Sequence, residues 1–245
     1  MQVLKLDKVS LTYFSDEGET LALKDISFEI NKGEFVSIVG PSGCGKTTIL
    51  SIISGLLKAT SGNVVLNEDS NNFVGYMFQK DNLLEWRSVL GNIYLGLELQ
   101  GKKTPENIKY AEDLLKKYNL WEFRHKHPRE LSGGMRQRVA LIRTLALRPS
   151  ILLLDEAFSA LDYQTRLDVC DDVYKIIKSE GLTAILVTHD ITEAITLSDR
   201  IIILSSRPAV VKQVMQVNVP GETPFIRRES PITQDYFDKI WRELK

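Results

Sequence analysis

The feature that most constrains this chain is a glycine-rich segment, GPSGCGKT at 40–47, which lies between two apolar runs of different period. The run before it, FVSIVG, is short and continuous, as in a buried strand, whereas KTTILSIISGLL after it has helical spacing. The pattern GxxxxGK[ST] between a strand and a helix predicts a phosphate-binding loop rather than an ordinary glycine turn. Backbone N–H groups and the helix N-terminus then point at the anion, Lys46 reaches the β- and γ-phosphates, and Thr47 ligates Mg²⁺.

A pair of adjacent carboxylates follows another apolar run. ILLLD at 151–155 has the composition of a buried parallel strand, and Glu156 comes directly after it. Such a strand delivers both side chains to the carboxyl edge of the sheet, where α/β proteins place ligands. Alone, the pattern is more typical of a plain strand end. Beside a phosphate-binding loop, it predicts that Asp155 holds Mg²⁺ through water and that Glu156 orients or deprotonates an attacking water.

A third segment, LSGGMRQ at 131–137, predicts a second helix N-terminus that can bind an anion. Ser132 is a candidate N-cap, and Gly133 and Gly134 leave the first backbone donors accessible. The apolar face of this helix is expected to comprise Met135, Val139, Ile142 and Ala146. In isolation, an ordinary capped helix is the better interpretation, so the anion site depends on the other motifs.

The composition excludes several classes of protein. Lysine plus arginine (31) and aspartate plus glutamate (32) leave a formal net charge of −1, so no basic field indicates nucleic-acid binding. The two cysteines, Cys44 and Cys170, suit a reducing compartment rather than a disulfide framework. No stretch approaches the roughly 20 apolar residues that span a bilayer, and the start, MQVLKLDKVS, lacks the layout of a signal peptide. We therefore expect a soluble cytoplasmic protein that meets a membrane only through a partner.

The order of the expected elements indicates an α/β fold in one domain, 1–245. A polar turn at 15–20 separates the first two strands, and the helix after the glycine-rich loop stops near a turn at 60–63. Strand–helix alternation in the second half argues for a parallel sheet. Short strands are expected at 3–14, 23–30, 35–40, 64–69, 73–78, 151–155, 183–189 and 200–206.

Helical segments interrupt this alternation. Helices are expected at 92–100, 105–118, 133–147 and 167–181, with Pro105 at a first helical position. The first three indicate a helical subdomain inserted at approximately 83–147. The chain after Ser206 is mixed and polar, and we treat 207–245 as a short C-terminal extension. It is expected to end in an amphipathic helix with Ser230 as N-cap and Pro231 at the first position.

Taken together, these segments resemble the ATP-binding cassette family of transport ATPases over nearly the whole chain. GPSGCGKTT looks like its Walker A motif, LSGGMRQRVALIRTL its signature helix, ILLLDE its Walker B motif, SALD its D-loop, VTHD its switch-histidine segment and Gln79 its Q-loop glutamine. The resemblance implies a P-loop NTPase cassette with a RecA-like core, an antiparallel β subdomain and an inserted helical subdomain. It also implies ATPase activity with ATP and Mg²⁺ in a head-to-tail homodimer, where Walker A of one copy faces LSGG of the other.

The resemblance implies a role for each matching position. Glu156, His189 and Gln79 are the implied catalytic residues, although His189 alone is more typical of a structural histidine at a strand end. The implied metal ligands are Thr47, Gln79 and Asp155. The implied nucleotide-binding residues are Tyr13, Gly40, Pro41, Ser42, Gly43, Cys44, Gly45, Lys46, Thr47 and Thr48. The implied contacts to the opposite copy's ATP are Leu131, Ser132, Gly133, Gly134, Met135 and Gln137, with Ser159, Ala160, Leu161 and Asp162 in the D-loop.

Two of these interpretations have an alternative. Tyr13 is placed like the family's adenine-stacking aromatic, but a core aromatic is a rival. The segment FQKDNLLEWRSVLGNIYLGLELQG resembles importers of the nitrate, sulfonate and taurine type, which implies a permease contact in the Gln79–Val89 region. The candidate contact residues, whose alternative is to pack the helical subdomain, are Leu83, Leu84, Trp86 and Val89.

The resemblance to this branch implies an ATPase subunit on the cytoplasmic face of the membrane. It would energise import of a small anion such as nitrate, a sulfonate, taurine or bicarbonate, with an extracytoplasmic solute-binding protein in the same system. Import of another solute, such as a vitamin precursor, and export are the alternatives. A DNA-repair ATPase would place a long coiled coil between Walker A and the signature, whereas about 90 residues without heptads lie there. A translation factor of this family would carry two sets of these motifs in one chain, whereas one set is present here.

Overall fold

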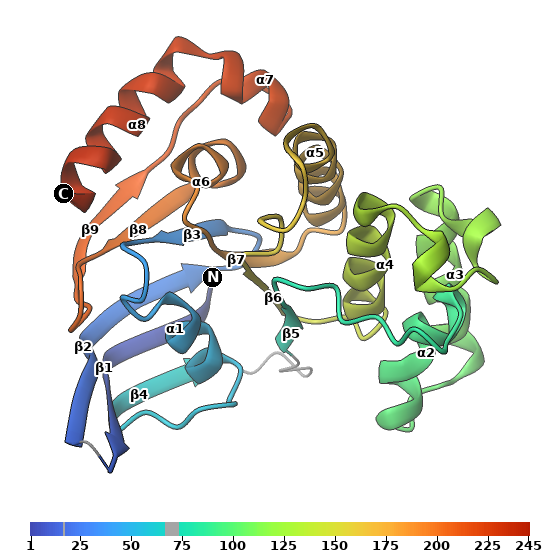
Figure 1. Cartoon of the computed structure of the whole chain (residues 1–245), viewed down its shortest axis with the longest axis horizontal. Coiled ribbons are helices and arrows are strands. Elements are labelled where there is room, and N and C mark those ends of the chain that lie inside the picture. Colours follow the sequence, from blue (N-terminus) through green and yellow to red (C-terminus); the bar gives the residue numbers. More distant parts are fainter. Residues whose placement is uncertain (17, 67–73) are drawn as a thin grey trace.

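An antiparallel sheet lies beside a mostly parallel one in this computed structural model, which describes residues 1–16, 18–66 and 74–245 (Figure 1). The antiparallel sheet has the order β2 (Gly18–Asn31), β1 (Gln2–Ser15), β4 (Ser61–Leu66). The second sheet has the order β5 (Val74–Met77), β6 (Ile151–Asp155), β7 (Thr183–Val187), β3 (Phe35–Val39), β8 (Arg200–Leu204), β9 (Val211–Gln216). Parts of three expected segments, at Glu17, 67–69 and Phe73, lie outside the described residues.

The antiparallel sheet forms because its strands alternate buried and exposed side chains. In β2, Ile26, Phe28 and Ile30 are buried and the residues between them are exposed. The turn expected at 60–63 is wrong, because Ser61 already pairs with Ser10 and the strand β4 begins there. The helix before it, α1 (Lys46–Ile53), ends earlier than its apolar pattern suggested.

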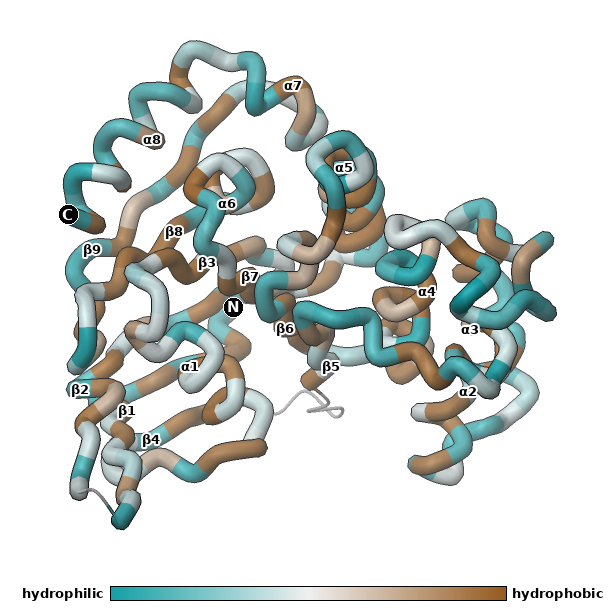
Figure 2. Tube along the Cα trace, in the orientation of Figure 1, coloured by the Kyte–Doolittle hydropathy of each residue, from teal (hydrophilic) through white to brown (hydrophobic). Residues whose placement is uncertain are grey.

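The central strands of the second sheet are buried throughout, as expected for parallel strands covered on both faces. All five positions of β3, β6 and β7 are buried, and Figure 2 shows apolar residues along the central strands. The last strand, β9, pairs antiparallel with β8 at the edge. The sequence did not predict β9, because only Val211 and Met215 of its six residues are partly buried and its apolar signal is weak.

Helices expected between residues 83 and 147 are present as α2 (Val89–Leu99), α3 (Pro105–Lys117) and α4 (Gly133–Leu145), with 3₁₀ turns at Trp121–Phe123 and Pro128–Glu130. Pro105 is at a first helical position, and the Ser132 side chain accepts a hydrogen bond from Met135 N, so both predictions are confirmed. Buried residues of these helices form one continuous cluster with residues of the parallel sheet.

Two of the four residues predicted to contact a permease belong to this buried cluster instead. Leu83 and Val89 are only 7% and 0% exposed and belong to the cluster, so they pack the helical segment rather than face a partner. Leu84 is partly buried, whereas Trp86 is 75% exposed. Sequence periodicity could not separate these residues, because they precede or begin a helix.

Four further helices follow the strand β6, and the last two form the C-terminal end of the chain. They are α5 (Tyr163–Ser179), α6 (Ile191–Leu197), α7 (Pro224–Glu229) and α8 (Pro231–Leu244). Ser230 and Pro231 begin α8 as expected, although the Ser230 side chain makes no capping hydrogen bond. Helix α7 was not predicted, and α8 packs against α6 and β8 through a cluster that includes Ile240. Within the described ranges, every helix is too short or too polar to cross a bilayer.

Candidate active site

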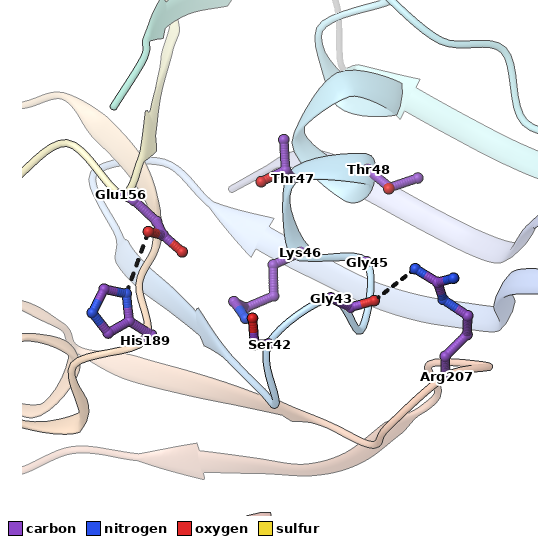
Figure 3. A pocket seen from close by; sticks show the side chains of 9 residues that line it. All are labelled: Ser42, Gly43, Gly45, Lys46, Thr47, Thr48, Glu156, His189 and Arg207. Atoms are coloured by element: carbon purple, nitrogen blue, oxygen red, sulfur yellow. Dashed lines mark hydrogen bonds and ion pairs between the residues drawn. The ribbon is translucent and has the colours of Figure 1, made fainter. Parts of the chain in front are cut away.

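A cavity of about 580 Å³ lies at the carboxyl ends of the parallel strands (Figure 3). The loop between β3 and α1 forms one side, Glu156 follows β6, and His189 follows β7. Parallel strands place such residues together because their carboxyl ends meet at one edge of the sheet. The lining residues are Ser42, Gly43, Gly45, Lys46, Thr47, Thr48, Glu156, His189 and Arg207.

The loop geometry requires glycine at Gly45. Its φ is 120°, and a Cβ atom there would lie 2.7 Å from Leu23 Cδ2. The buried Lys46 Nζ donates hydrogen bonds to the carbonyl oxygens of Gly40, at 2.9 Å, and Pro41, at 3.0 Å. The loop therefore presents a cation whose position is fixed by its own backbone.

Four residues implied as nucleotide contacts do not line the cavity: Tyr13, Gly40, Pro41 and Cys44. Cys44 is 1% exposed, and its sulfur fills the space beside Gly40, where a Cβ atom would lie only 2.8 Å from it. Burial raises the pKa of the Cys44 thiol, and Lys46 opposes this only in part. The Cys44 side chain thus packs behind the loop.

Oxygen atoms gather around Asp155. Thr47 Oγ1 donates to Asp155 Oδ1 and Tyr76 Oη donates to Asp155 Oδ2, both at 2.9 Å. Burial raises the pKa of Asp155, while these hydrogen bonds lower it. Across 1–16, 18–66 and 74–245, no group of three His, Cys, Asp or Glu side chains is arranged to hold a metal ion. The donor set instead fits Mg²⁺, which takes one or two protein oxygens together with water and substrate phosphates.

Glu156 and His189 face one another across the cavity. His189 Nδ1 lies 3.3 Å from Glu156 Oε2, and the His189 side chain is 59% exposed, which does not fit a buried structural histidine. Glu156 has φ 47°, in the left-handed region that non-glycine residues rarely adopt. Its N–H donates to Val187 O at 2.8 Å, and Ser159 Oγ donates to its carbonyl oxygen at 2.9 Å. Bonds on both sides therefore hold this uncommon conformation, as is frequent at active sites.

Tyr13 lies beside the first turn of α1. Its hydroxyl is hydrogen bonded to Thr48 Oγ1 at 3.2 Å, and the residue is 42% exposed. The alternative of a core aromatic is therefore wrong, because this side chain is substantially exposed.

A second cavity of about 340 Å³ is lined by four of the implied signature and D-loop residues, Gly133, Gln137, Ala160 and Leu161. Gln79 lines this cavity rather than the first one, and its Nε2 donates to Ser159 Oγ at 3.0 Å. The Gln137 side chain donates to Gln79 O at 3.4 Å. The lining residues are Gln79, Lys80, Asp81, Asn82, Gly133, Arg136, Gln137, Ala160 and Leu161. Gln79 therefore does not line the cavity that Thr47 lines, although both are implied metal ligands.

Buried members of this group have a packing role. Leu131, Gly134 and Gln137 are buried, and Met135 packs against the cluster below them. A Cβ atom on Gly134 would lie 2.9 Å from Thr165 Cγ2 and 3.0 Å from Val169 Cγ2 of α5, so glycine allows the two helices to approach closely. Ser132 is exposed at the helix start.

The D-loop ends at the cap of the next helix. Asp162 Oδ1 accepts a hydrogen bond of 3.1 Å from Thr165 N, and this interaction with Thr165 lowers the pKa of Asp162. Ser159 and Leu161 lie between this cap and Glu156, and Leu161 is buried. The D-loop is therefore fixed at both ends, by Glu156 and by α5.

Sequence reasoning missed Tyr76 and Arg207. Tyr76 lies three residues before Gln79 but has no motif of its own, and burial together with Asp155 raises its pKa. Arg207 begins the mixed, polar segment after Ser206, which was treated only as a short C-terminal extension. Nothing in the local pattern indicated that the turn after β8 reaches the glycine-rich loop.

Comparison with known proteins identifies the family to which the chain belongs. The family model described as ABC transporter matches residues 23–159. The uncharacterized ABC transporter ATP-binding protein YtlC of Bacillus subtilis is 46% identical, over 100% of this chain and 96% of that protein. The nitrate import ATP-binding protein NrtD of Synechocystis sp. is 38% identical, over 98% of this chain and 89% of that protein.

A solved structure gives the same result for the fold. The dimeric structure of MJ0796, a bacterial ABC transporter cassette, is similar with a TM-score of 0.73 at 35% identity, covering 88% of this chain and 99% of that chain. The α/β core, the antiparallel sheet and the helical segment are thus those of an ATPase cassette, as expected. The glycine-rich loop, the oxygen donors at Thr47 and Asp155, and the carboxylate of Glu156 fit ATP and Mg²⁺. The chain belongs to the ABC transporter family, in which it is an ATP-binding and ATP-hydrolysing subunit.

Proposed function

We propose that this chain energises an importer of a small anion such as nitrate, by hydrolysing ATP at composite sites in a head-to-tail dimer. The name of the similar NrtD protein and the resemblance of residues 78–101 to nitrate- and sulfonate-type importers support the solute class. The dimeric MJ0796 cassette supports the assembly.

The observation that carries the composite site is the separation of two cavities on one chain. Lys46, Glu156 and His189 line the first cavity, whereas Gly133 lines the second and Ser132 begins the helix beside it. Helix N-termini bind anions, so the exposed start of α4 can bind a phosphate. The glycine-rich loop of the same chain lies at the other cavity, so that phosphate comes from a nucleotide on a second copy. A second copy in the opposite orientation supplies it: each signature helix faces the other copy's glycine-rich loop.

Within each composite site, the residues divide the work of phosphoryl transfer. Thr47 and Asp155 are the residues that would hold Mg²⁺, which would supply charge neutralisation at the phosphates. Lys46 and the loop N–H groups bind the phosphates, and Tyr13 stacks on adenine, which is worth about 1–3 kcal/mol. Glu156 accepts the proton of the attacking water, and His189 holds Glu156 in place and contacts the γ-phosphate.

The remaining motifs connect this chemistry to partners. Gln79 is bonded to the D-loop through Ser159, and the segment that follows it carries the exposed Trp86. Under this proposal, the Gln79–Val89 region contacts permease subunits, with Trp86 and Leu84 as contact residues. The chain then lies on the cytoplasmic face of the membrane as a peripheral subunit, and a solute-binding protein delivers the anion outside.

Mixing two inactive variants tests the composite site. Lys46→Ala removes the phosphate-binding cation of one chain, and Ser132→Arg blocks the signature helix of the other. Each variant alone should hydrolyse ATP at background rates, whereas a mixed dimer, purified through two different tags, retains one intact composite site and should recover activity. Absence of any recovery in verified mixed dimers contradicts two independent composite sites.

Vesicle transport tests the solute. The subunit is purified with the membrane subunits that accompany it and reconstituted with the matching binding protein. We expect nitrate to stimulate ATP hydrolysis and to accumulate in the vesicles with wild-type subunit but not with Glu156→Gln. Stimulation by an unrelated solute and none by nitrate contradicts the proposed solute while leaving the ATPase role intact.

A further inference from the structure

Arg207 lines the first cavity although it lies outside every motif assigned to it. The residue is exposed in the turn between β8 and β9, and its Nη2 donates a 2.9 Å hydrogen bond to Gly43 O in the glycine-rich loop. Figure 3 shows Arg207 on the side of the loop away from Glu156 and His189, with Lys46 between them. A cation therefore flanks the loop on the side opposite the proposed hydrolytic residues.

The backbone that carries Arg207 is fixed. Ala209, two residues later, is fully buried and exchanges two hydrogen bonds of 2.9 Å with β2, to Ala22 O and from Lys24 N. Ser205 N donates to Val210 O at 3.0 Å and closes the turn. Arg207 is thus not a freely moving surface arginine, because its main chain is tied to the antiparallel sheet beside the loop.

The charge of Arg207 has no carboxylate partner in the described part of the chain. Its only protein acceptor there is the neutral carbonyl of Gly43, whereas Arg200 in the preceding strand pairs with Glu34 at 2.8 Å. A guanidinium has five N–H donors in a planar fork that suits phosphate. Most of its donors and its whole charge thus remain available to an anion in the cavity.

The position of Arg207 indicates which part of a nucleotide it meets. Thr48, which is bonded to Tyr13, lies on the same side of the loop as Arg207 (Figure 3). In the proposed function, Tyr13 binds adenine, and His189 binds the γ-phosphate on the other side. We propose that Arg207 is a further nucleotide-binding residue, whose guanidinium contacts the α-phosphate and ribose of ATP. This inference rests on the proposed orientation of ATP in the site.

A contact at that end has a distinctive consequence. ATP and ADP share the α-phosphate and ribose, so Arg207 stabilises both to the same extent. Interactions that are equal in the ground and transition states change KM but leave kcat unchanged. His189, by contrast, is placed at the phosphate that only ATP carries.

Calorimetric titration of ATP and ADP tests the proposal with three substitutions at one position. Charge-assisted hydrogen bonds contribute about 1.5–3 kcal/mol, so Arg207→Ala should raise the Kd of both nucleotides about ten-fold or more, and KM should rise with kcat unchanged. Arg207→Lys keeps the charge and should retain most of the affinity. Arg207→Gln can still donate to Gly43 O but is neutral, so it should behave like Arg207→Ala. Arg242→Ala, an exposed arginine on α8, is the matched control.

Three results would overturn the proposal. Unchanged affinity in Arg207→Ala removes the contact altogether. Loss of ATP binding without loss of ADP binding places Arg207 at the γ-phosphate. Full affinity in Arg207→Gln shows that the residue only supports the loop through Gly43. Lys46→Ala tests the proposed nucleotide site independently of Arg207, because this substitution should abolish binding of both ATP and ADP. If Lys46→Ala still binds both nucleotides, the proposed function fails, whereas the three results above concern Arg207 alone.

Discussion

The hydroxyl of Thr47 donates a hydrogen bond of 2.9 Å to Oδ1 of Asp155, which is 108 residues further along the chain. This bond joins the first turn of α1 to the end of β6, so the glycine-rich loop and the acidic strand end have one fixed relative position. Asp155 is 8% exposed, and burial raises the pKa of its carboxyl group despite the donors around it.

Asp155→Asn should abolish Mg²⁺-dependent hydrolysis and stabilise the fold at neutral pH. A carboxyl whose folded-state pKa is raised contributes stability below its unfolded pKa, and this contribution is lost as the pH rises through the folded pKa. The melting temperature of Asp155→Asn relative to wild type, measured without nucleotide, should therefore increase from acidic to neutral pH. A pH-independent difference contradicts the prediction.

Glu156→Gln should retain ATP binding and lose hydrolysis. Removing a general base costs about 10²–10⁴-fold in rate, while Lys46 and the loop that bind the phosphates are untouched. ATP should therefore convert the variant to a stable dimer, which light scattering detects. Lys46→Ala is the control that neither binds nor dimerises. Ordinary turnover by Glu156→Gln removes this residue from the catalytic role.

Gly134→Ala should destabilise the protein by about 1–3 kcal/mol, because the added methyl group overpacks the contact of α4 with Thr165 and Val169. Gly133→Ala is the matched control, since its nearest neighbour is the end of the Leu161 side chain at 3.2 Å. Thr165→Ser removes one of the two methyl groups and should recover part of the loss. Urea unfolding measures all three, and equal effects at the two glycines contradict the packing role.

Trp86→Ala should leave the isolated subunit intact and uncouple it from the membrane subunits. The side chain is 75% exposed, so the free energy of unfolding should change by no more than about 0.5 kcal/mol. ATP hydrolysis by the subunit alone should be unchanged, while transport and copurification of the permease should fall. Val89→Ala, at a fully buried neighbour, should destabilise the subunit instead. Unaltered transport by Trp86→Ala would show that Trp86 is not a permease contact.

Much of this architecture could be predicted from local sequence patterns. Continuous apolar runs identified β3, β6 and β7 because strands covered on both faces must be apolar throughout. The glycine-rich loop and the N-cap at Ser132 have residue requirements that a short segment displays fully. The edge strand β9 could not be predicted from its apolar pattern. It needs few apolar residues, because β8 supplies its hydrogen-bond partners.

The contents of the two cavities were harder to predict, because they depend on which distant segments meet. Arg207 reaches the loop only because Ala209 is bonded to β2, and no neighbouring residue signals this. Gln79 was expected at the same site as Thr47, but it lines the second cavity, where its side chain donates a hydrogen bond to Ser159. Motif spacing gives the order of the functional residues, and only tertiary contacts give their grouping.

The two carbonyl bonds of Lys46 bear on ligand discrimination. Gly40 O and Pro41 O accept hydrogen bonds from two of the three donors of the ammonium group, so one donor and the charge remain for an anion. A lone phosphate or sulfate ion offers few contacts in return, whereas a nucleotide also engages the loop N–H groups and the adenine side. The fixed position of one lysine thereby favours a ligand that makes several contacts at once over a lone anion.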